Sequence, residues 1–257
     1  MRRTQAARAL IAFGCSATLA LGTGWAQVAV AHSPWDALLQ RHVHGGRADY
    51  PSFQRARNEL ERYLATLATI NPDDLHSKQA QAAFWINAYN ACVIKGVLEH
   101  YPLTSVRKVK GFFDRIRYQV AGQALTLNEI EAKGRALGDW RIHVALVCAS
   151  SSCPLLRSEA YVPERLDDQL SDQAKQFFRD ASRGLLLDAA RHTLWVSKIV
   201  RWHATDFIPS GKLTAEGLLP ILRPYLDPAM LLSTHHQKLT LKFLDYDWSL
   251  NRQKESN

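Results

Sequence analysis

The chain has 257 residues, of which 47% are hydrophobic and 22% are charged, and its formal net charge is +8. This length supports one large hydrophobic core or two smaller ones. The sequence shows no repeat with a period of 20 to 50 residues and no basic run interleaved with aromatic residues. We therefore expect neither a repeat architecture nor nucleic-acid binding.

The first 31 residues have the pattern of a cleaved signal peptide. Three arginines precede an apolar segment, Ala9 to Trp25, that lacks acidic residues, and Ala29-Val-Ala31 supplies a small-x-small cleavage site. Removal of this leader takes away three arginines and no acid, which lowers the formal charge to about +5. We predict export to a bacterial periplasm, or secretion, with a mitochondrial presequence as the alternative. No later segment is long and apolar enough to span a bilayer.

Helical patterns dominate the region that follows the leader. Ser33-Pro34-Trp35 opens one helix, and Phe53 to Leu67 carries an amphipathic one. A third helix runs from about Lys78 to His100 and is apolar nearly all round between Phe84 and Ile94. Such a helix is expected to be buried at the centre of the fold.

Two asparagines interrupt the apolar surface of this central helix. Asn87 and Asn90 stand three residues apart and therefore share a face. A buried amide needs hydrogen-bond partners. Two interpretations are open: the pair ties the helix to neighbouring backbone, or one of them lines a pocket.

Hairpins and further helices are expected after residue 110. The predicted elements are a hairpin of 117–120 and 123–125, a helix capped by Thr126 or Asn128, a helix over 163–181, a hairpin of 185–188 and 193–196, a helix capped by Ser197, helices over 213–222 and 228–232, and a strand within 238–248. Helices and strands mix without a regular β-α-β order. This mixture predicts a single α+β domain over residues 32–251, with the buried helix packed on a small mixed or antiparallel sheet, and a C-terminal tail of 252–257.

The stretch from Arg141 to Pro154 is the candidate for chemistry. Its first half, Arg141 to Val147, is apolar and rich in β-branched residues, which predicts a short buried strand. The second half is a polar loop ending at a proline, and loops held by a rigid element commonly carry reactive groups. This stretch contains His143, Cys148, Ser150, Ser152 and Cys153.

Once the leader is removed, three cysteines remain, namely Cys92, Cys148 and Cys153. An odd number in an oxidising compartment leaves at least one thiol free or paired between chains. Cys92 lies among small apolar residues in the central helix, which predicts an inert buried thiol.

Several blocks together resemble one family. They are Phe84-Trp-Ile-Asn-Ala-Tyr-Asn-Ala91, Leu125-Thr-Leu-Asn-Glu-Ile-Glu131, His143 to Pro154, Tyr161, Leu194 to Ile199, Asp206-Phe207 and Tyr246 to Asn251. In this order they are similar to the domain of unknown function 547, from about Phe84 to Asn251. The resemblance implies functional positions rather than a reaction, and these are Asn87, Asn90, Glu131, His143, Cys148, Ser152 and Asp206.

The chain also departs from the family pattern. His203 stands where an aromatic residue is more usual, and the turn after Glu131 lacks the usual apolar-arginine ending. Related eukaryotic members do not always keep a cysteine at the position of Cys153. The resemblance therefore argues against an obligatory disulfide or metal site through Cys153.

The first functional hypothesis is a thiol-dependent hydrolase, or an acyl or amide transferase. Cys148 would be the nucleophile, His143 the base, and Glu131 or Asn87 the group that orients the base. The serine-rich loop could supply backbone donors to an oxyanion. Positions 143 and 148 would face opposite sides of an unbroken strand, so they meet only if the strand bends or ends near Val147.

The second hypothesis is a non-catalytic binding or scaffold protein in which Cys148 and Cys153 form a structural disulfide. A zinc site built on His143 and these two cysteines would have too few ligands, so we assign no metal and no cofactor. Candidate binding residues are Asn90, Ser150, Ser152, Cys153 and Asp206. The substrate class is open, and an unidentified small molecule or peptide with an acyl or amide group fits the first hypothesis.

Overall fold

The computed structural model describes residues 30–230 and 238–253. Nearly all of the predicted signal peptide, residues 1–29, lies outside the described residues. The helices are α1 Ser33–His42, α2 Tyr50–Arg55, α3 Arg57–Thr69, α4 Lys78–Glu99, α5 Leu127–Arg135, α6 Leu166–Arg179, α7 Lys198–Trp202, α8 Ala204–Phe207 and α9 Ala215–Leu222. The strands are β1 Val43–His44, β2 Arg47–Ala48, β3 Tyr118–Val120, β4 Gln123–Leu125, β5 Leu185–Asp188, β6 Thr193–Val196 and β7 Thr240–Phe243. The predicted α+β class is confirmed.

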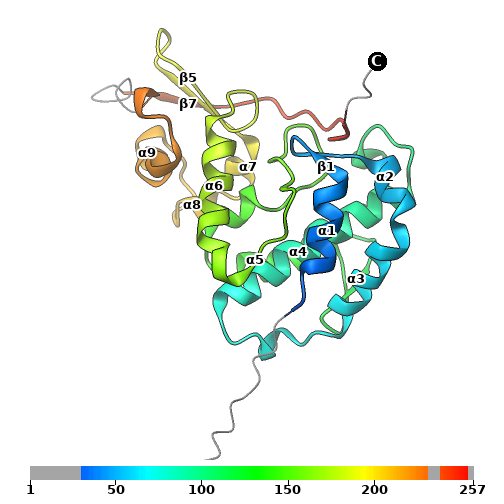
Figure 1. Ribbon diagram of the computed structural model, residues 1–257. Coiled ribbons are helices and arrows are strands. Elements are labelled where there is room, and N and C mark those ends of the chain that lie inside the picture. The colour runs from blue at the N-terminus through cyan, green and yellow to red at the C-terminus, as the bar shows by residue number, and fades with distance from the viewer. Residues whose placement is uncertain (1–29, 231–237, 254–257) are drawn as a thin grey trace, which may run out of the picture.

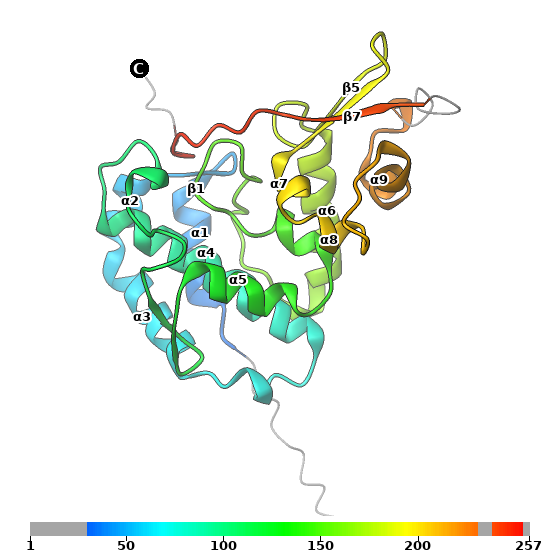
Figure 2. The same cartoon turned by 180° about the vertical axis from the view of Figure 1, so that it is seen from behind.

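The first hydrophobic core surrounds α4, as the sequence predicted. The Ser77 hydroxyl caps this helix by accepting a hydrogen bond from Ala80 N at 3.0 Å. Every residue from Ala83 to Ile94 is buried. Helix α4 packs most extensively on α5 and also contacts α2 and α3, and the view from behind shows α5 lying along α4 (Figure 2). The apolar surface of α4 is thus covered from several sides, which explains its lack of a polar face.

A second core lies beside the first and contains the three-stranded sheet. In this sheet β5 pairs antiparallel with β6, and β6 pairs parallel with β7, so the sheet is mixed. Phe177 and Phe178 of helix α6 belong to this second core together with residues of the sheet, and residues of α7 to α9 complete it. Figure 1 shows α1 to α3 on one side of the molecule and the sheet with α6 to α9 on the other.

The segment after β7 connects the two cores. It runs back across the molecule (Figure 1) and forms isolated bridges between Ser150 and Leu250 and between Ala48 and Arg252. The Tyr50 hydroxyl donates to the Asn251 side chain at 2.6 Å. The predicted long strand of 238–248 is regular only in β7, because the chain then leaves the sheet to make these contacts.

Both predicted hairpins are present with two- to four-residue turns. In the first, Val120 pairs with Gln123, and the turn residues Ala121 and Gly122 have φ angles of 55° and 71°. Two consecutive positive φ angles match the twist of the flanking strands. The helix predicted over 228–232 reaches beyond residue 230 and lies partly outside the described residues.

The strand predicted for Arg141 to Val147 is wrong. Trp140–Val144 is a 3-10 helix, capped by the Asp139 carboxylate, which accepts from Arg141 N at 2.9 Å. The run from Ile142 to Val147 is buried at every position rather than on alternate ones, and an apolar run signals burial without specifying a strand. The chain therefore turns between His143 and Cys148, and the two residues are not on opposite faces of a strand.

Among the described residues, no helix combines the length and the apolar character that crossing a bilayer would require.

Candidate functional site

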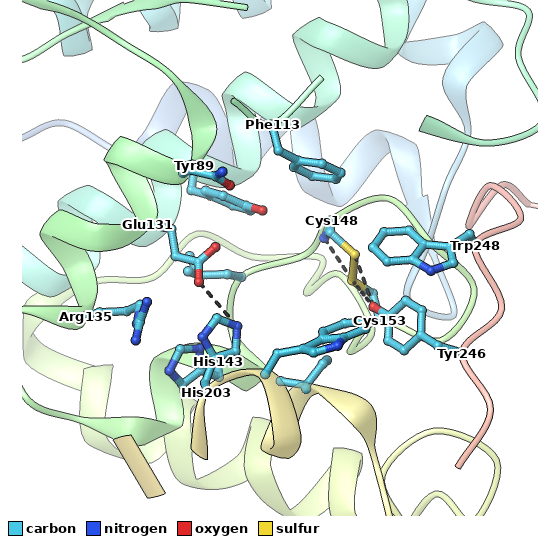
Figure 3. A pocket seen from close by; sticks show the side chains of 14 residues that line it. Tyr89, Phe113, Glu131, Arg135, His143, Cys148, Cys153, His203, Tyr246 and Trp248 are labelled. Carbon is cyan, nitrogen blue, oxygen red and sulfur yellow. Dashed lines mark hydrogen bonds and ion pairs between the residues drawn. A yellow bond between two sulfur atoms is a disulfide. The ribbon is translucent and has the colours of Figure 1, made fainter. Parts of the chain in front are cut away.

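A pocket of about 530 Å³ opens where the two cores meet. Side chains from both cores line it: Tyr89, Phe113, Asn128, Glu131, Arg135, His143, Leu146, Cys148, Cys153, Ile199, Trp202, His203, Tyr246 and Trp248. Figure 3 shows imidazole and carboxylate groups gathered on one side and sulfur atoms on the other. We call these the imidazole end, formed by Glu131, Arg135, His143, His203 and Asp206, and the sulfur end, formed by Cys148, Ser150, Cys153 and Tyr246.

Helix α5 contributes two charged residues to the imidazole end. Its start is fixed by a capping box in which Thr126 Oγ1 accepts from Glu129 N and Glu129 Oε2 accepts from Thr126 N. Glu131 and Arg135 are four residues apart on this helix and therefore share a face, and both line the pocket.

Asp206 of α8 joins Arg135 to His143. Its Oδ2 lies 2.8 Å from Arg135 Nε and 2.7 Å from His143 Nε2, and its Oδ1 lies 3.1 Å from Arg135 Nη2. The hydrogen bond from Arg135, followed by that from His143, holds the pKa of Asp206 well below its ordinary value. An ionised carboxylate only accepts hydrogen bonds, so His143 carries its proton on Nε2. Its Nδ1 then keeps a free electron pair.

His203, which follows α7, stacks on His143. The ring centroids are 3.9 Å apart with an interplanar angle of 20°, and His203 Nε2 lies 3.4 Å from Glu131 Oε1. Burial lowers the pKa of His203 to about 3 and also lowers the pKa of His143. Burial raises the pKa of Glu131. Near pH 7 both imidazoles are therefore neutral, and each keeps one ring nitrogen with a free electron pair.

The sulfur end is built on a disulfide between Cys148 and Cys153. Cys148 N donates to Cys153 Sγ at 2.9 Å, and Ala149, which directly follows Cys148, has a φ of 61°. The Ser150 hydroxyl donates to the Tyr246 oxygen at 3.0 Å, and the Tyr246 hydroxyl in turn donates to Cys153 Sγ at 3.3 Å. Burial raises the pKa of Tyr246 to about 12, so this phenol remains a donor at neutral pH.

Hydrogen bonds attach residues 148–153, here called the cysteine loop, to the segment after β7. Asp247 N donates to Ser152 Oγ at 2.8 Å, and Ser151 N donates to the Ser249 carbonyl at 2.8 Å. These contacts place Tyr246 beside the two sulfur atoms.

Aromatic side chains form one wall beside the sulfur end. The Trp202 ring lies 4.8 Å from Tyr246 and stacks at 5.8 Å on Trp248. Trp202 is 48% exposed, and the Arg107 guanidinium lies 5.4 Å from the Trp248 ring centroid. Exposed, stacked rings of this kind can bind the flat or apolar part of a ligand.

The structure brings most of the predicted residues to this pocket. Glu131, His143, Cys148 and Cys153 line it directly. Asp206 and Ser150 contact lining residues, and Ser152 fixes the loop. Among the described residues, no hydrogen bond joins His143 to Cys148, and the sulfur of Cys148 is bonded to Cys153.

The two asparagines of α4 do not line the pocket. The Asn87 amide donates to the Tyr161 carbonyl at 2.7 Å and accepts from Tyr161 N at 3.0 Å. The Asn90 amide donates to the Ala145 carbonyl at 3.0 Å and accepts from Val147 N at 2.9 Å. These contacts match the interpretation in which both residues tie the helix to neighbouring backbone.

Sequence reasoning did not assign His203, Arg135 or the aromatic wall to the site. For His203 a signal was present, since a histidine occupies a position where the family resemblance leads one to expect an aromatic residue. Arg135 lay one helical turn after Glu131 on the same predicted helix. The aromatic residues Tyr246 and Trp248 belonged to a block that the resemblance identified without a role.

Residues 72–178 match the family model described as "Protein of unknown function, DUF547". No curated protein and no solved structure matches the chain. The expected resemblance is thus confirmed for the part of the chain that includes α4, α5 and the cysteine loop. His203, Asp206 and Tyr246 lie beyond the matched residues.

Proposed function

The chain carries a DUF547 region over residues 72–178, and on that premise we propose that its pocket catalyses thiol-dependent hydrolysis or transfer of an acyl or amide group. Cys148 is the nucleophile and His143 is the base. One observation carries the proposal: the two side chains line the same pocket, and Asp206 orients the imidazole. An oriented, neutral imidazole activates a cysteine thiol that comes within its hydrogen-bond reach.

The disulfide makes this activity conditional on reduction. A dithiol reductant supplies two electrons and two protons, which convert the bond into the Cys148 and Cys153 thiols while the reductant becomes a disulfide. Cys148 is half-buried whereas Cys153 is buried, so Cys148 is the sulfur that a substrate can reach.

Catalysis then follows two steps. His143 Nδ1 takes the proton of the Cys148 thiol, the thiolate attacks the substrate carbonyl, and the leaving group departs with that proton, which leaves a thioester on Cys148. Water or an acceptor then attacks the thioester, gives up a proton to His143 and releases the free thiol. Asp206 stabilises the imidazolium that forms in each step.

Residue-resolved alkylation of the reduced protein tests the thiol. We expect Cys148 to react with iodoacetamide below pH 7 at least about tenfold faster than glutathione, since the thiolate is the reactive form. His143→Ala should remove this advantage, and His44→Gln, at an exposed position on β1, should not. Equal rates for Cys148 and glutathione in the wild-type protein would contradict the proposal.

A second candidate is a binding or scaffold protein in which the disulfide is structural. The observation in its favour is that the bond is present and that the loop it closes also contacts the C-terminal segment. This candidate predicts that reduction destabilises the protein without creating a reactive thiol. The alkylation experiment therefore separates the two.

We place the protein in the periplasm or outside the cell, with a small molecule or peptide as the ligand of the pocket. The leader pattern supports export, and a disulfide fits an oxidising compartment. N-terminal sequencing of protein recovered from a periplasmic extract should begin at His32. Recovery of the chain from the cytosolic fraction with its leader intact would contradict this location.

A further inference from the structure

Three potential metal ligands meet in the imidazole end. Glu131, His143 and His203 each offer one nitrogen or carboxylate oxygen, and these atoms all lie within 4.8 Å of one another. The residues come from three separate parts of the chain, namely α5, the 3-10 helix after it, and the link between α7 and α8. From this convergence we infer that the pocket binds a single transition-metal ion of the zinc class through these three side chains.

The type and number of ligands favour such an ion. Two imidazoles and one carboxylate are the donor set of several zinc sites that keep a coordination position open. All three side chains line the 530 Å³ pocket, so the position not taken by protein faces the cavity. Hard cations such as Mg²⁺ or Ca²⁺ prefer oxygen ligands and are a poorer match.

The spacing is close to that of a loaded site. His203 Nε2 and Glu131 Oε1 are 3.4 Å apart, which is about the separation of two ligand atoms that sit 2.1 Å from a tetrahedral ion. No two of the three ligand atoms are more than 4.8 Å apart, which exceeds this ideal by at most about 1.4 Å. Small rotations of the Glu131 and His203 side chains, which are 18% and 20% exposed, can close that gap.

The surrounding charges suit a divalent cation. Asp206 accepts from His143 Nε2, which leaves Nδ1 as the ring nitrogen free to bind an ion. Carboxylates commonly hold metal-bound histidines in this way. Asp206 is itself paired with Arg135 through two hydrogen bonds, whereas Glu131 has no ion pair with a lysine or arginine among the residues described. Glu131 therefore supplies the negative charge that the ion neutralises.

This inference goes beyond the proposed thiol reaction and does not depend on it. An ion bound to His143 takes up the nitrogen that would otherwise accept the Cys148 proton. Metal loading and thiol activation of the same molecule therefore exclude each other.

Cobalt binding to the oxidised protein tests the site. In untagged protein that begins at His32, and so lacks Cys15 of the predicted leader, the Cys148–Cys153 bond leaves no thiol of that pair to bind metal, and Cys92 is fully buried. Titration with Co²⁺, followed by visible absorption and by competition with Zn²⁺, should show one ion per chain in a four- or five-coordinate site without sulfur-to-metal charge transfer.

Variants assign the ligands. His203→Phe keeps a ring stacked on His143 but offers no ligand atom, and it should weaken binding at least about 100-fold. Glu131→Gln, which is nearly isosteric, should weaken it to a similar extent. Asp206→Asn should weaken it about 10-fold, as expected for a residue that orients a ligand. The control His44→Gln should leave binding unchanged.

Two results would overturn the inference: no binding tighter than about 100 µM, or wild-type affinity in both His203→Phe and Glu131→Gln. Thermal unfolding of each variant confirms that it is folded, and if His203→Phe does not fold, Glu131→Gln decides the question. Because the thiol experiment uses reduced protein and this one uses oxidised protein, failure of either leaves the other intact.

Discussion

The imidazole end and the sulfur end share one pocket, but different kinds of interaction stabilise each of them. The imidazole end depends on a chain of charged and titratable groups in which Asp206 joins Arg135 to His143. The sulfur end depends on a covalent bond and on neutral hydrogen bonds from Ser150 and Tyr246. Because of this difference, we expect acid to destabilise the imidazole end and a reductant to destabilise the sulfur end of the same cavity.

Asn90 lies behind both ends. Its amide holds Ala145 and Val147, which are the residues between the 3-10 helix that carries His143 and the loop that carries Cys148. It thereby couples α4 to the one segment that the two ends have in common.

The largest effect is expected from Asn90→Ala. Two buried backbone groups lose their partners, and each costs about 1 to 3 kcal/mol, so the free energy of unfolding should fall by about 4 kcal/mol. Urea unfolding measures this. Asn58→Ala, at an exposed position on α3, should change stability by less than about 0.5 kcal/mol. A loss below 1 kcal/mol in Asn90→Ala would show that the two ends do not share this support.

Acid should destabilise the protein through the imidazole end and not through the sulfur end. The pKa of His203 in the folded protein is about 3, whereas an unfolded histidine has a pKa of about 6.5. The unfolded chain therefore takes up the proton first. The contribution of His203 to the free energy of unfolding is fully present above pH 6.5. It decreases as the pH falls toward 3, and the loss is about 2 kcal/mol at pH 5.

Urea unfolding at pH 7 and pH 5 measures the acid effect. His203→Phe should reduce the difference by about 2 kcal/mol, while His32, whose pKa burial lowers to about 4, contributes a separate part. A Cys148→Ser/Cys153→Ser double variant should retain the whole difference. Equal acid sensitivity in wild type and His203→Phe would show that other groups dominate.

Reduction should destabilise the protein through the sulfur end and not through the imidazole end. The cysteines are five residues apart, and closing so short a loop stabilises a protein by about 2 kcal/mol in the chain-entropy treatment. Addition of a dithiol reductant should therefore lower the urea midpoint of the wild-type protein at pH 7. The Cys148→Ser/Cys153→Ser double variant should not respond to reductant, and a response in it would point to another cause.

The smallest effect is expected from Tyr246→Phe. This change removes the hydroxyl that accepts from Ser150 and donates to Cys153 but keeps the ring against Trp202 and Trp248. A loss of about 1 kcal/mol is expected, without any change in acid sensitivity. Tyr225→Phe, which keeps its ring contact with Trp140, serves as the matched control and should be nearly neutral.

Much of the fold could be predicted because local patterns decide it. The limits of α4 followed from its apolar surface and from Pro102 after its end, and the hairpin of β3 and β4 followed from alternation around Ala121-Gly122. The strand over Arg141 to Val147 failed for a specific reason. That run is buried from all sides by two cores, and an apolar run of this length carries no period that separates a strand from a turn of helix.

For the site, the sequence by itself determined which short stretch holds reactive groups, namely His143, Cys148 and Cys153, and it marked Glu131 and Asp206 through the family resemblance. Only the tertiary structure decided how they combine. The turn after His143 brings that imidazole and Cys148 to one cavity, and the fold adds His203 and Tyr246 from residues 60 to about 100 positions away in the chain. Such convergence depends on long-range packing of two cores, which leaves no periodic trace in the local sequence.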